Sequence, residues 1–294
     1  MKRINVLGVG ISAITPQRAL QHIAGWVESG ERHYVCVCAV HTVMECQRDP
    51  ELRGMVNRAS LAVPDGMPLV WISRFRGQPH VRRVYGPDLM LSFCELAARW
   101  GYTNYLVGGA PGQPEVLARR LVERFPDLLI VGGVATPVRP LSAAENDRII
   151  ESINDAGPDV VWVGMGTGYQ ERWIAQNRHR LRAPVLIGVG AAFDMHSKRV
   201  RQAPAWMQWS GLEWLFRLMQ EPLRLWRRYL LGNPLFVYRL LLQQLGVRSY
   251  PEPEEPEGAL PELILPRSAP MFVELPLVEK VPEPGLPRTE SLRG

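Results

Sequence analysis

Short apolar runs alternate with amphipathic segments from the start of the chain to residue 189. The runs typical of β-strands are 5–15, 34–40, 61–63, 104–107, 128–131, 159–163 and 185–189. The segments with helical periodicity are 16–29, 49–58, 67–75, 89–100, 115–125, 142–154 and 170–178. Strands that alternate with helices predict an α/β fold with a mostly parallel, Rossmann-like sheet and helices on both of its faces.

Four loops follow predicted strands and therefore share one edge of such a sheet. Ligands of parallel sheets bind beyond the carboxyl ends of the strands. The four loops are 65–66, 108–109, 164–168 and 190–194. We expect them to converge on a binding site.

Two of these loops are rich in glycine. Gly108 and Gly109 open one turn, and Gly164 and Gly166 open another. Backbone N–H groups between a strand and a helix can hold a phosphate, although ordinary tight turns are an equal alternative. Neither turn has the Lys-Ser/Thr pair of a P-loop or the spaced acid of a dinucleotide fold. An ATPase or a dehydrogenase is therefore disfavoured.

Two aspartates also stand at predicted strand ends. Asp65 lies in VPDGMP and Asp194 in AAFDMHS. A carboxylate at this edge can accept the proton of an attacking hydroxyl group. The alternative for each is to cap the helix that follows.

The C-terminal part of the chain changes character twice. Segment 196–248 holds nine Lys/Arg against two acids, and its stretch 209–231 interleaves arginine with Trp, Leu, Phe and Tyr. This mixture of arginine and large apolar residues predicts an amphipathic helical segment that lies on an anionic membrane surface and is kinked or split at Pro222. Packing on the body or in a homo-oligomer is the alternative, and nucleic acid is disfavoured. Segment 249–294 has ten prolines and nine glutamates and is expected to be disordered.

The sequence offers little for a metal or a membrane span. The chain has no Asp-x-Asp pair and no His/Cys/acid cluster, so we expect no metal and no cofactor. Cys36 and Cys38 should be packed thiols on one strand face. No window of about 18 apolar residues suggests a spanning helix, and no signal peptide opens the chain. We expect a cytoplasmic protein bound peripherally to the inner face of the membrane.

Eight ordered motifs between residues 5 and 246 resemble the WecG/TagA/CpsF family of bacterial glycosyltransferases. The motifs are DPEL at 49, VPDGMPLVW at 63, RVYGPDL at 83, LVGG at 106, WVGMGTGYQERW at 162, GVGAAFD at 188, QAPAWMQ at 202 and GLEWLFRLMQEPLRLWRRY at 211. The resemblance implies inverting, metal-independent transfer of an N-acetylmannosamine-type sugar or related hexose. The donor would be a UDP-sugar, and the acceptor a polyprenyl-diphosphate-linked saccharide of a cell-surface or exopolysaccharide pathway.

The resemblance also implies roles for individual residues. Asp65 matches the general base, and Arg83 and Gln170 match residues near the donor. The donor-binding residues that we expect are Arg83, Gly108, Gly109, Gly164, Gly166, Gln170 and Asp194. The residues that we expect to bind the acceptor or its diphosphate are Arg217, Arg224, Arg227 and Arg228. They lie in a segment that would cover the site, so the predicted division is a body (1–195), an appendage (196–248) and a tail (249–294).

This sequence departs from the family pattern at three places on the donor side. Ala39 stands where the family commonly has Asn, Tyr169 where it has Lys, and a Gly expected after Asp194 is replaced. A catalytically degenerate relative, which binds a nucleotide-sugar or a lipid-linked glycan as an assembly subunit, is therefore the alternative function.

Overall fold

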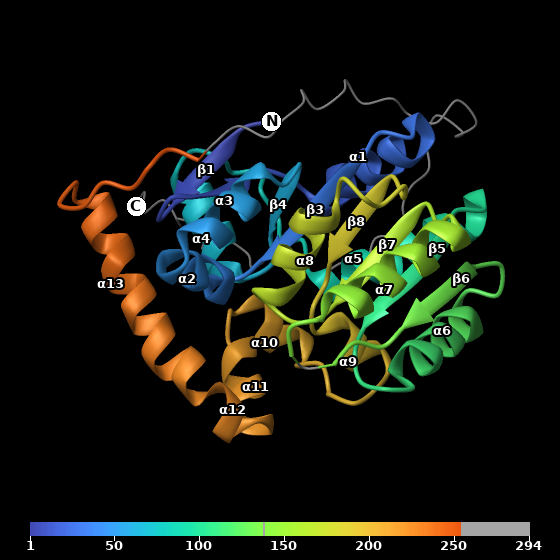
Figure 1. Cartoon of the computed structure of the whole chain (residues 1–294). Helices are drawn as coiled ribbons and strands as arrows, with labels where there is room; N and C mark the ends of the chain where they lie inside the picture. The colour runs from blue at the N-terminus through green and yellow to red at the C-terminus, as the bar shows by residue number, and fades with distance from the viewer. Residues whose placement is uncertain (138, 254–294) are drawn as a thin grey trace, which may run out of the picture.

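A six-stranded parallel sheet forms the centre of the protein (Figure 1). The computed structural model describes residues 1–137 and 139–253. Every strand pairing in this sheet is parallel, and the strand order is β4-β3-β8-β7-β5-β6. The strands are β3 (His33–Cys38), β4 (Leu61–Pro64), β5 (Thr103–Gly108), β6 (Leu129–Val134), β7 (Val160–Gly164) and β8 (Val185–Gly188). The predicted α/β fold is confirmed.

Seven helices connect these strands, and an eighth, α1, precedes β3. They are α1 (Pro16–Ser29), α2 (Val40–Arg48), α3 (Pro50–Arg58), α4 (Met67–Phe75), α5 (Gly86–Trp100), α6 (Gln113–Arg124), α7 (Ala143–Ala156) and α8 (Tyr169–Asn177). The chain begins with an antiparallel hairpin of β1 (Arg3–Val6) and β2 (Val9–Ser12). Helix α7 has the predicted capping box. The Ser142 hydroxyl oxygen accepts a hydrogen bond from the Glu145 N–H, and the Glu145 carboxylate accepts one from the Ser142 N–H.

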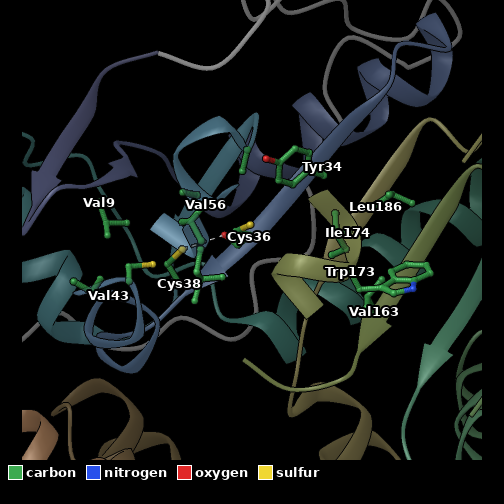
Figure 2. Close-up of a cluster of buried hydrophobic side chains, with 14 of the residues drawn as sticks. Val9, Tyr34, Cys36, Cys38, Val43, Val56, Val163, Trp173, Ile174 and Leu186 are labelled. Atoms are coloured by element: carbon green, nitrogen blue, oxygen red, sulfur yellow. Dashed lines mark hydrogen bonds between the residues drawn. The ribbon is translucent and has the colours of Figure 1, made fainter. Parts of the chain in front are cut away.

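The two faces of the sheet carry separate apolar clusters. One face buries Cys36 and Cys38 of β3 against Val43 of α2, Val56 of α3 and Trp173 of α8 (Figure 2). All four cysteines are free and buried, so the expected packed thiols are confirmed. The opposite face packs against α1, α5 and α6 through side chains that include Trp26, Phe93 and Leu117. Helices therefore cover both faces, as the alternating pattern predicts.

The C-terminal segment consists of short helices that follow the body. They are α9 (Ala192–His196), α10 (Ala205–Trp209), α11 (Glu213–Gln220), α12 (Pro222–Trp226), the π-helix η1 (Arg227–Leu231) and α13 (Gly232–Gln244). Pro222 is the first residue of α12, so the predicted break falls where proline cannot continue a helix. Phe236 of α13 is buried with the cluster that includes Val43 of α2. In Figure 1 helix α13 runs along the side that carries α2 and α4, opposite α6, whereas α9 lies near α6.

Helix α2 is absent from the sequence-based expectation. The apolar run of β3 continues into Val40 without a polar interruption, and the N-cap position is Ala39, which makes no side-chain cap. The usual signal of a helix start is therefore missing. Most of the predicted disordered tail, residues 254–294, lies outside the described residues. No helix that the structure describes combines the length and the apolar character needed to cross a bilayer.

Candidate functional site

A cavity of about 600 Å³ lies between the carboxyl ends of the strands and the C-terminal helices. Loops after β3, β4, β7 and β8 form its inner wall, and α11, η1 and α13 form its outer wall. Residues 196–248, expected to cover the site, therefore contribute part of its lining. The cavity lies at the predicted edge of the sheet.

Asp65 lies in this cavity, directly after β4. Helix α4 has Gly66 as its N-cap and no side-chain cap, so the alternative capping role of Asp65 is not observed there. The carboxylate instead accepts a hydrogen bond of 3.3 Å from the N–H of Gly86, at the start of α5. It is thus held at the end of a second helix.

The surroundings of Asp65 make it a stronger base than an ordinary aspartate. Burial, together with the nearby Glu213 carboxylate, raises the pKa of its carboxyl group to about 6 in spite of lowering contributions from Arg83, the Gly86 N–H and Arg217. A group with this pKa is ionised at neutral pH and accepts a proton more readily than one near its usual value of 3.8.

Arg83 joins Asp65 to the C-terminal segment. Its Nε donates to the main-chain carbonyl of Asp65, and its Nη2 donates to Oε2 of Glu213, 2.5 Å away. The same Nη2 is 3.8 Å from Oδ1 of Asp65. The guanidinium lies 3.9 Å from the ring centre of Tyr85, whose hydroxyl donates to Oε1 of Glu213. Arg83 therefore sits in the cavity, but its side chain is occupied by protein contacts.

Three of the four predicted acceptor-side arginines line the cavity, namely Arg217, Arg224 and Arg228. Nε of Arg217 is buried and has no hydrogen-bond partner among the described residues. Arg227 is not part of the lining; its guanidinium lies over the exposed Trp226 ring, 5.2 Å from the ring centre. The structure thus separates Arg227 from the other three.

Gln170, one of the predicted donor-binding residues, lines the cavity from α8. Its Nε2 donates to the buried Glu171 carboxylate over 2.9 Å, and Glu171 also accepts from the N–H of Gly168. Oε1 of Gln170 is buried and has no partner in the described part of the chain. An acceptor atom left unpaired in this way is costly unless a ligand donates to it. Among the predicted donor-binding residues, Gln170 gives the clearest indication of a ligand.

Asp194 and Gly166 also line the cavity. Asp194 lies within α9 rather than at a helix N-cap, so its alternative capping role is not observed. Its carboxylate accepts a hydrogen bond of 2.9 Å from Nε2 of Gln113 at the start of α6. Gly190 stands beside them at the end of β8.

The other three predicted donor-binding glycines do not line the cavity. A Cβ atom on Gly108 would lie 2.6 Å from the backbone of Gly164, and one on Gly164 would lie 2.6 Å from the Phe193 ring. The φ angle of +78° at Gly109 is one that glycine favours, and its N–H donates to the carbonyl of Gly164. Close packing accounts for these glycines, and their donor-binding role stays a prediction without a place in the cavity.

The structure adds residues that the sequence reasoning did not single out. Glu213 and Tyr85 meet Arg83 in the cavity, and His41 enters it from the start of α2. Burial, followed by the charges of Arg228, Arg48 and Arg217, lowers the pKa of His41 to about 3, which keeps its ring neutral. The position of His41 just after β3 is the signal that points to this edge. Ala39, in the same loop, presents only a methyl group to the cavity.

The described residues contain no group of three or more His, Cys, Asp or Glu side chains arranged to hold a metal ion. Metal independence stays a prediction.

Known proteins resemble this chain over almost all of its described length. A family model described as "Glycosyl transferase WecG/TagA/CpsF family" matches residues 4–250. A protein of Bacillus subtilis (strain 168) is 26% identical over 243 residues, which cover 80% of this chain and 92% of the relative. One of Bacillus spizizenii is 29% identical over 197 residues, 67% of this chain and 74% of the relative. Both relatives are named N-acetylglucosaminyldiphosphoundecaprenol N-acetyl-beta-D-mannosaminyltransferase.

The matched range takes in the six-stranded sheet, the Asp65 loop and all the helices from α9 to α13. The chain belongs to the WecG/TagA/CpsF family of glycosyl transferases.

Proposed function

We propose that this protein transfers an N-acetylmannosamine-type sugar, or a related hexose, from a UDP-sugar to a polyprenyl-diphosphate-linked saccharide. The reaction inverts the anomeric carbon and uses no divalent metal. The observation that carries the proposal is the position of Asp65, a half-buried carboxylate with a raised pKa in a cavity lined by four arginines. The names of the two relatives support the choice of sugar and acceptor.

Asp65 acts as the general base in this reaction. It takes the proton from the acceptor hydroxyl group as that oxygen forms a bond to the anomeric carbon. The bond between the anomeric carbon and the diphosphate oxygen breaks on the opposite side, and UDP departs with the electron pair. One displacement of this kind inverts the configuration and leaves the proton on Asp65.

The arginines supply positive charge for the diphosphate groups. Arg217, Arg224 and Arg228 converge on the cavity from α11, α12 and η1, and the unpaired Nε of Arg217 is a donor that an anionic ligand would satisfy. Charge-assisted hydrogen bonds from arginine match the oxygens of a diphosphate. Fixed positive charge of this kind stabilises a departing or bound diphosphate without a metal ion.

The C-terminal helices bring the enzyme to its lipid-linked acceptor. Exposed apolar side chains lie on α11 to α13, including Met219, Leu223, Leu231 and Leu241, and arginines accompany them. A basic helix with an apolar face binds to the surface of an anionic bilayer. We therefore propose that the protein works at the inner face of the cell membrane, bound peripherally. Packing of the same surface in a homo-oligomer is the alternative.

A transfer assay tests the proposed function. The full chain is incubated with radiolabelled UDP-sugars and a polyprenyl-diphosphate-linked N-acetylglucosamine acceptor, with and without EDTA. The proposal expects labelled lipid-linked disaccharide from UDP-N-acetylmannosamine or a related donor, at the same rate in EDTA. Donor binding without transfer to the acceptor would instead favour the catalytically degenerate assembly subunit. Loss of transfer in EDTA would refute the metal-independent reaction.

A further inference from the structure

Glu213, the first residue of α11, places a second carboxylate beside the proposed base. Its side chain reaches back from the C-terminal segment into the cavity, where it is largely buried. Oε2 accepts a hydrogen bond from Nη2 of Arg83, and Oε1 accepts one from the Tyr85 hydroxyl, with 2.9 Å between the two oxygens. Both partners belong to the segment that leads into α5 and lie far from Glu213 in the sequence. Two hydrogen bonds thus fix both oxygens of one carboxylate.

The start of α11 is also held in place by close packing. Gly211 has a φ angle of +74°, and a Cβ atom on it would lie 2.7 Å from the Trp71 ring of α4. Only glycine allows this approach without displacing the indole ring. Because α4 begins just after Asp65, this contact ties the position of Glu213 to the loop that carries Asp65.

Arg83 stands between two carboxylates and contacts them unequally. Its Nη2 group is 2.5 Å from Glu213 but 3.8 Å from Oδ1 of Asp65, beyond hydrogen-bonding distance. An arginine paired closely with Asp65 would stabilise the ionised carboxylate and reduce its tendency to take a proton. The Nη2 group instead donates to Glu213, while Nε of Arg83 holds the main-chain carbonyl of Asp65.

We infer, on the basis of the proposed function, that Glu213 is a positioning residue that keeps the Nη2 group of Arg83 out of hydrogen-bonding distance of the Asp65 carboxylate, and so leaves that carboxylate available to the acceptor hydroxyl group. Since Glu213 is carried by α11, the base reaches this state only when the C-terminal segment is docked on the body.

The charged groups around the two carboxylates agree with this role. Asp65 faces Arg83 from the segment before α5 and both Glu213 and Arg217 from α11, with the Gly86 N–H at its other side. Glu213 faces Arg83, Tyr85, Asp65 and Arg217. Burial raises the pKa of Asp88 on α5, and the Glu213 charge contributes to this rise. Burial and the Glu213 charge raise the pKa of Asp65 in spite of two nearby arginines. Removing the Glu213 charge ends its repulsion of the Asp65 carboxylate and lets the Arg83 charge act more strongly on that carboxylate. Both changes lower the pKa of Asp65.

The test compares pH profiles of transfer for the full chain and its Glu213→Gln variant. The glutamine can still accept a hydrogen bond but carries no charge. We expect the acid limb of kcat/KM to move about one pH unit lower, and kcat on the plateau to fall about tenfold because Asp65 becomes a weaker base. Glu95→Gln is the matched control: it removes the same charge from an exposed pair with Arg99 on α5, and its profile should equal that of the wild type.

A purely structural role for Glu213 gives a different result. The acceptor KM would rise while the acid limb stayed in place, and that outcome overturns the inference. Where Glu213→Gln leaves no measurable turnover, Glu213→Asp decides. If Glu213→Asp recovers turnover with the acid limb of the wild type, the charge at this position is needed. If both variants lose turnover, the inference is overturned.

An Asp65→Asn variant measured in the same series separates this inference from the proposed function. If Asp65→Asn is inactive but the limb of Glu213→Gln does not move, only the role of Glu213 falls. If Asp65→Asn keeps normal turnover, the proposed base is wrong and the inference falls with it.

Discussion

The N–H of Gly86 donates to the Asp65 carboxylate across 3.3 Å, so the amino end of α5 faces the carboxylate that follows β4. A helix amino terminus favours negative charge. This contact and the nearby arginines keep Asp65 ionised at neutral pH, although burial raises its pKa to about 6. The balance gives a carboxylate that is charged and still basic.

The pH dependence of transfer should report this balance. Transfer needs the ionised form of Asp65, so kcat/KM should fall as the pH drops through about 6, the raised pKa of the carboxyl group. Asp65→Asn should lower kcat by roughly 10²–10⁴-fold, the usual contribution of a general base. The residual rate should lack this acid limb, and the melting temperature should not drop. An unchanged acid limb in Asp65→Asn would assign the titration to another group.

Arginine substitutions should distinguish the arginines that act in the cavity from those that lie on the surface. Arg217→Ala should raise KM for the acceptor, with a loss of about 1.5–3 kcal/mol for a hydrogen bond to a charged group. Arg227→Ala is the matched control, because Arg227 lies over the Trp226 ring outside the cavity. With a short-chain, water-soluble acceptor its kinetics should equal those of the wild type. Equal losses in both variants would argue for a general charge effect.

Glu171 should act on the donor through Gln170. In the wild type its carboxylate fixes the Gln170 amide, which leaves Oε1 to accept a hydrogen bond from the donor. Glu171→Gln can pair with either end of that amide, so the orientation is no longer enforced. We expect a donor KM several-fold higher and an acceptor KM unchanged, measured by initial rates. A change in the acceptor KM alone would contradict this assignment.

Gly108 provides a test of packing against donor binding. A Cβ atom at this position would clash with the Gly164 backbone, and its φ angle of +119° disfavours other residues. Gly108→Ala should therefore destabilise the fold by roughly 1–3 kcal/mol, seen as a lower melting temperature. The donor KM of the folded fraction should be unchanged. A higher donor KM at normal stability would restore the phosphate-binding role predicted from the sequence.

Membrane binding should depend on the exposed apolar residues of the C-terminal helices. Leu223 is 92% exposed and Leu231 58% exposed. Exchanging both for Glu should weaken binding to anionic vesicles about a hundredfold or more, because the loss of buried apolar area costs ~1.5 kcal/mol or more per leucine. Val122→Glu on α6, at the opposite side of the molecule, is the control. Unchanged vesicle sedimentation of the double variant would disprove the proposed surface.

Local signals made most of the body predictable. Pro16 follows Thr15, whose hydroxyl caps α1, and Gly30 ends the helix with a positive φ angle, so both ends of α1 are encoded within a few residues. The alternation of strands with helices then fixes which strand ends meet at one edge. Asp65, Gly166, Gln170 and Asp194 all reach the cavity from that edge.

Long-range contacts were not predictable in the same way. Glu213 reads as an ordinary polar residue of an amphipathic helix, and nothing near it indicates Arg83 as its partner. Gly108 and Gly109 resemble a phosphate-binding turn, but the strand order puts β5 beyond β7, away from the cavity. Arg227 and Arg228 are neighbours in the sequence, and only the course of the helix decides which one faces inward.

The π-helix η1 lets the segment between α12 and α13 accept the loss of one residue. A π-turn holds about one residue more than an α-turn, so the five residues of η1 turn the chain through nearly the same angle as one residue fewer in an α-helix. Deleting Leu230 would convert the turn to regular α-helix and leave α13 facing nearly the same way. Phe236 would then keep its place in the core beside α2. An inserted residue would instead rotate α13 by about 100° and take Phe236 out of that core.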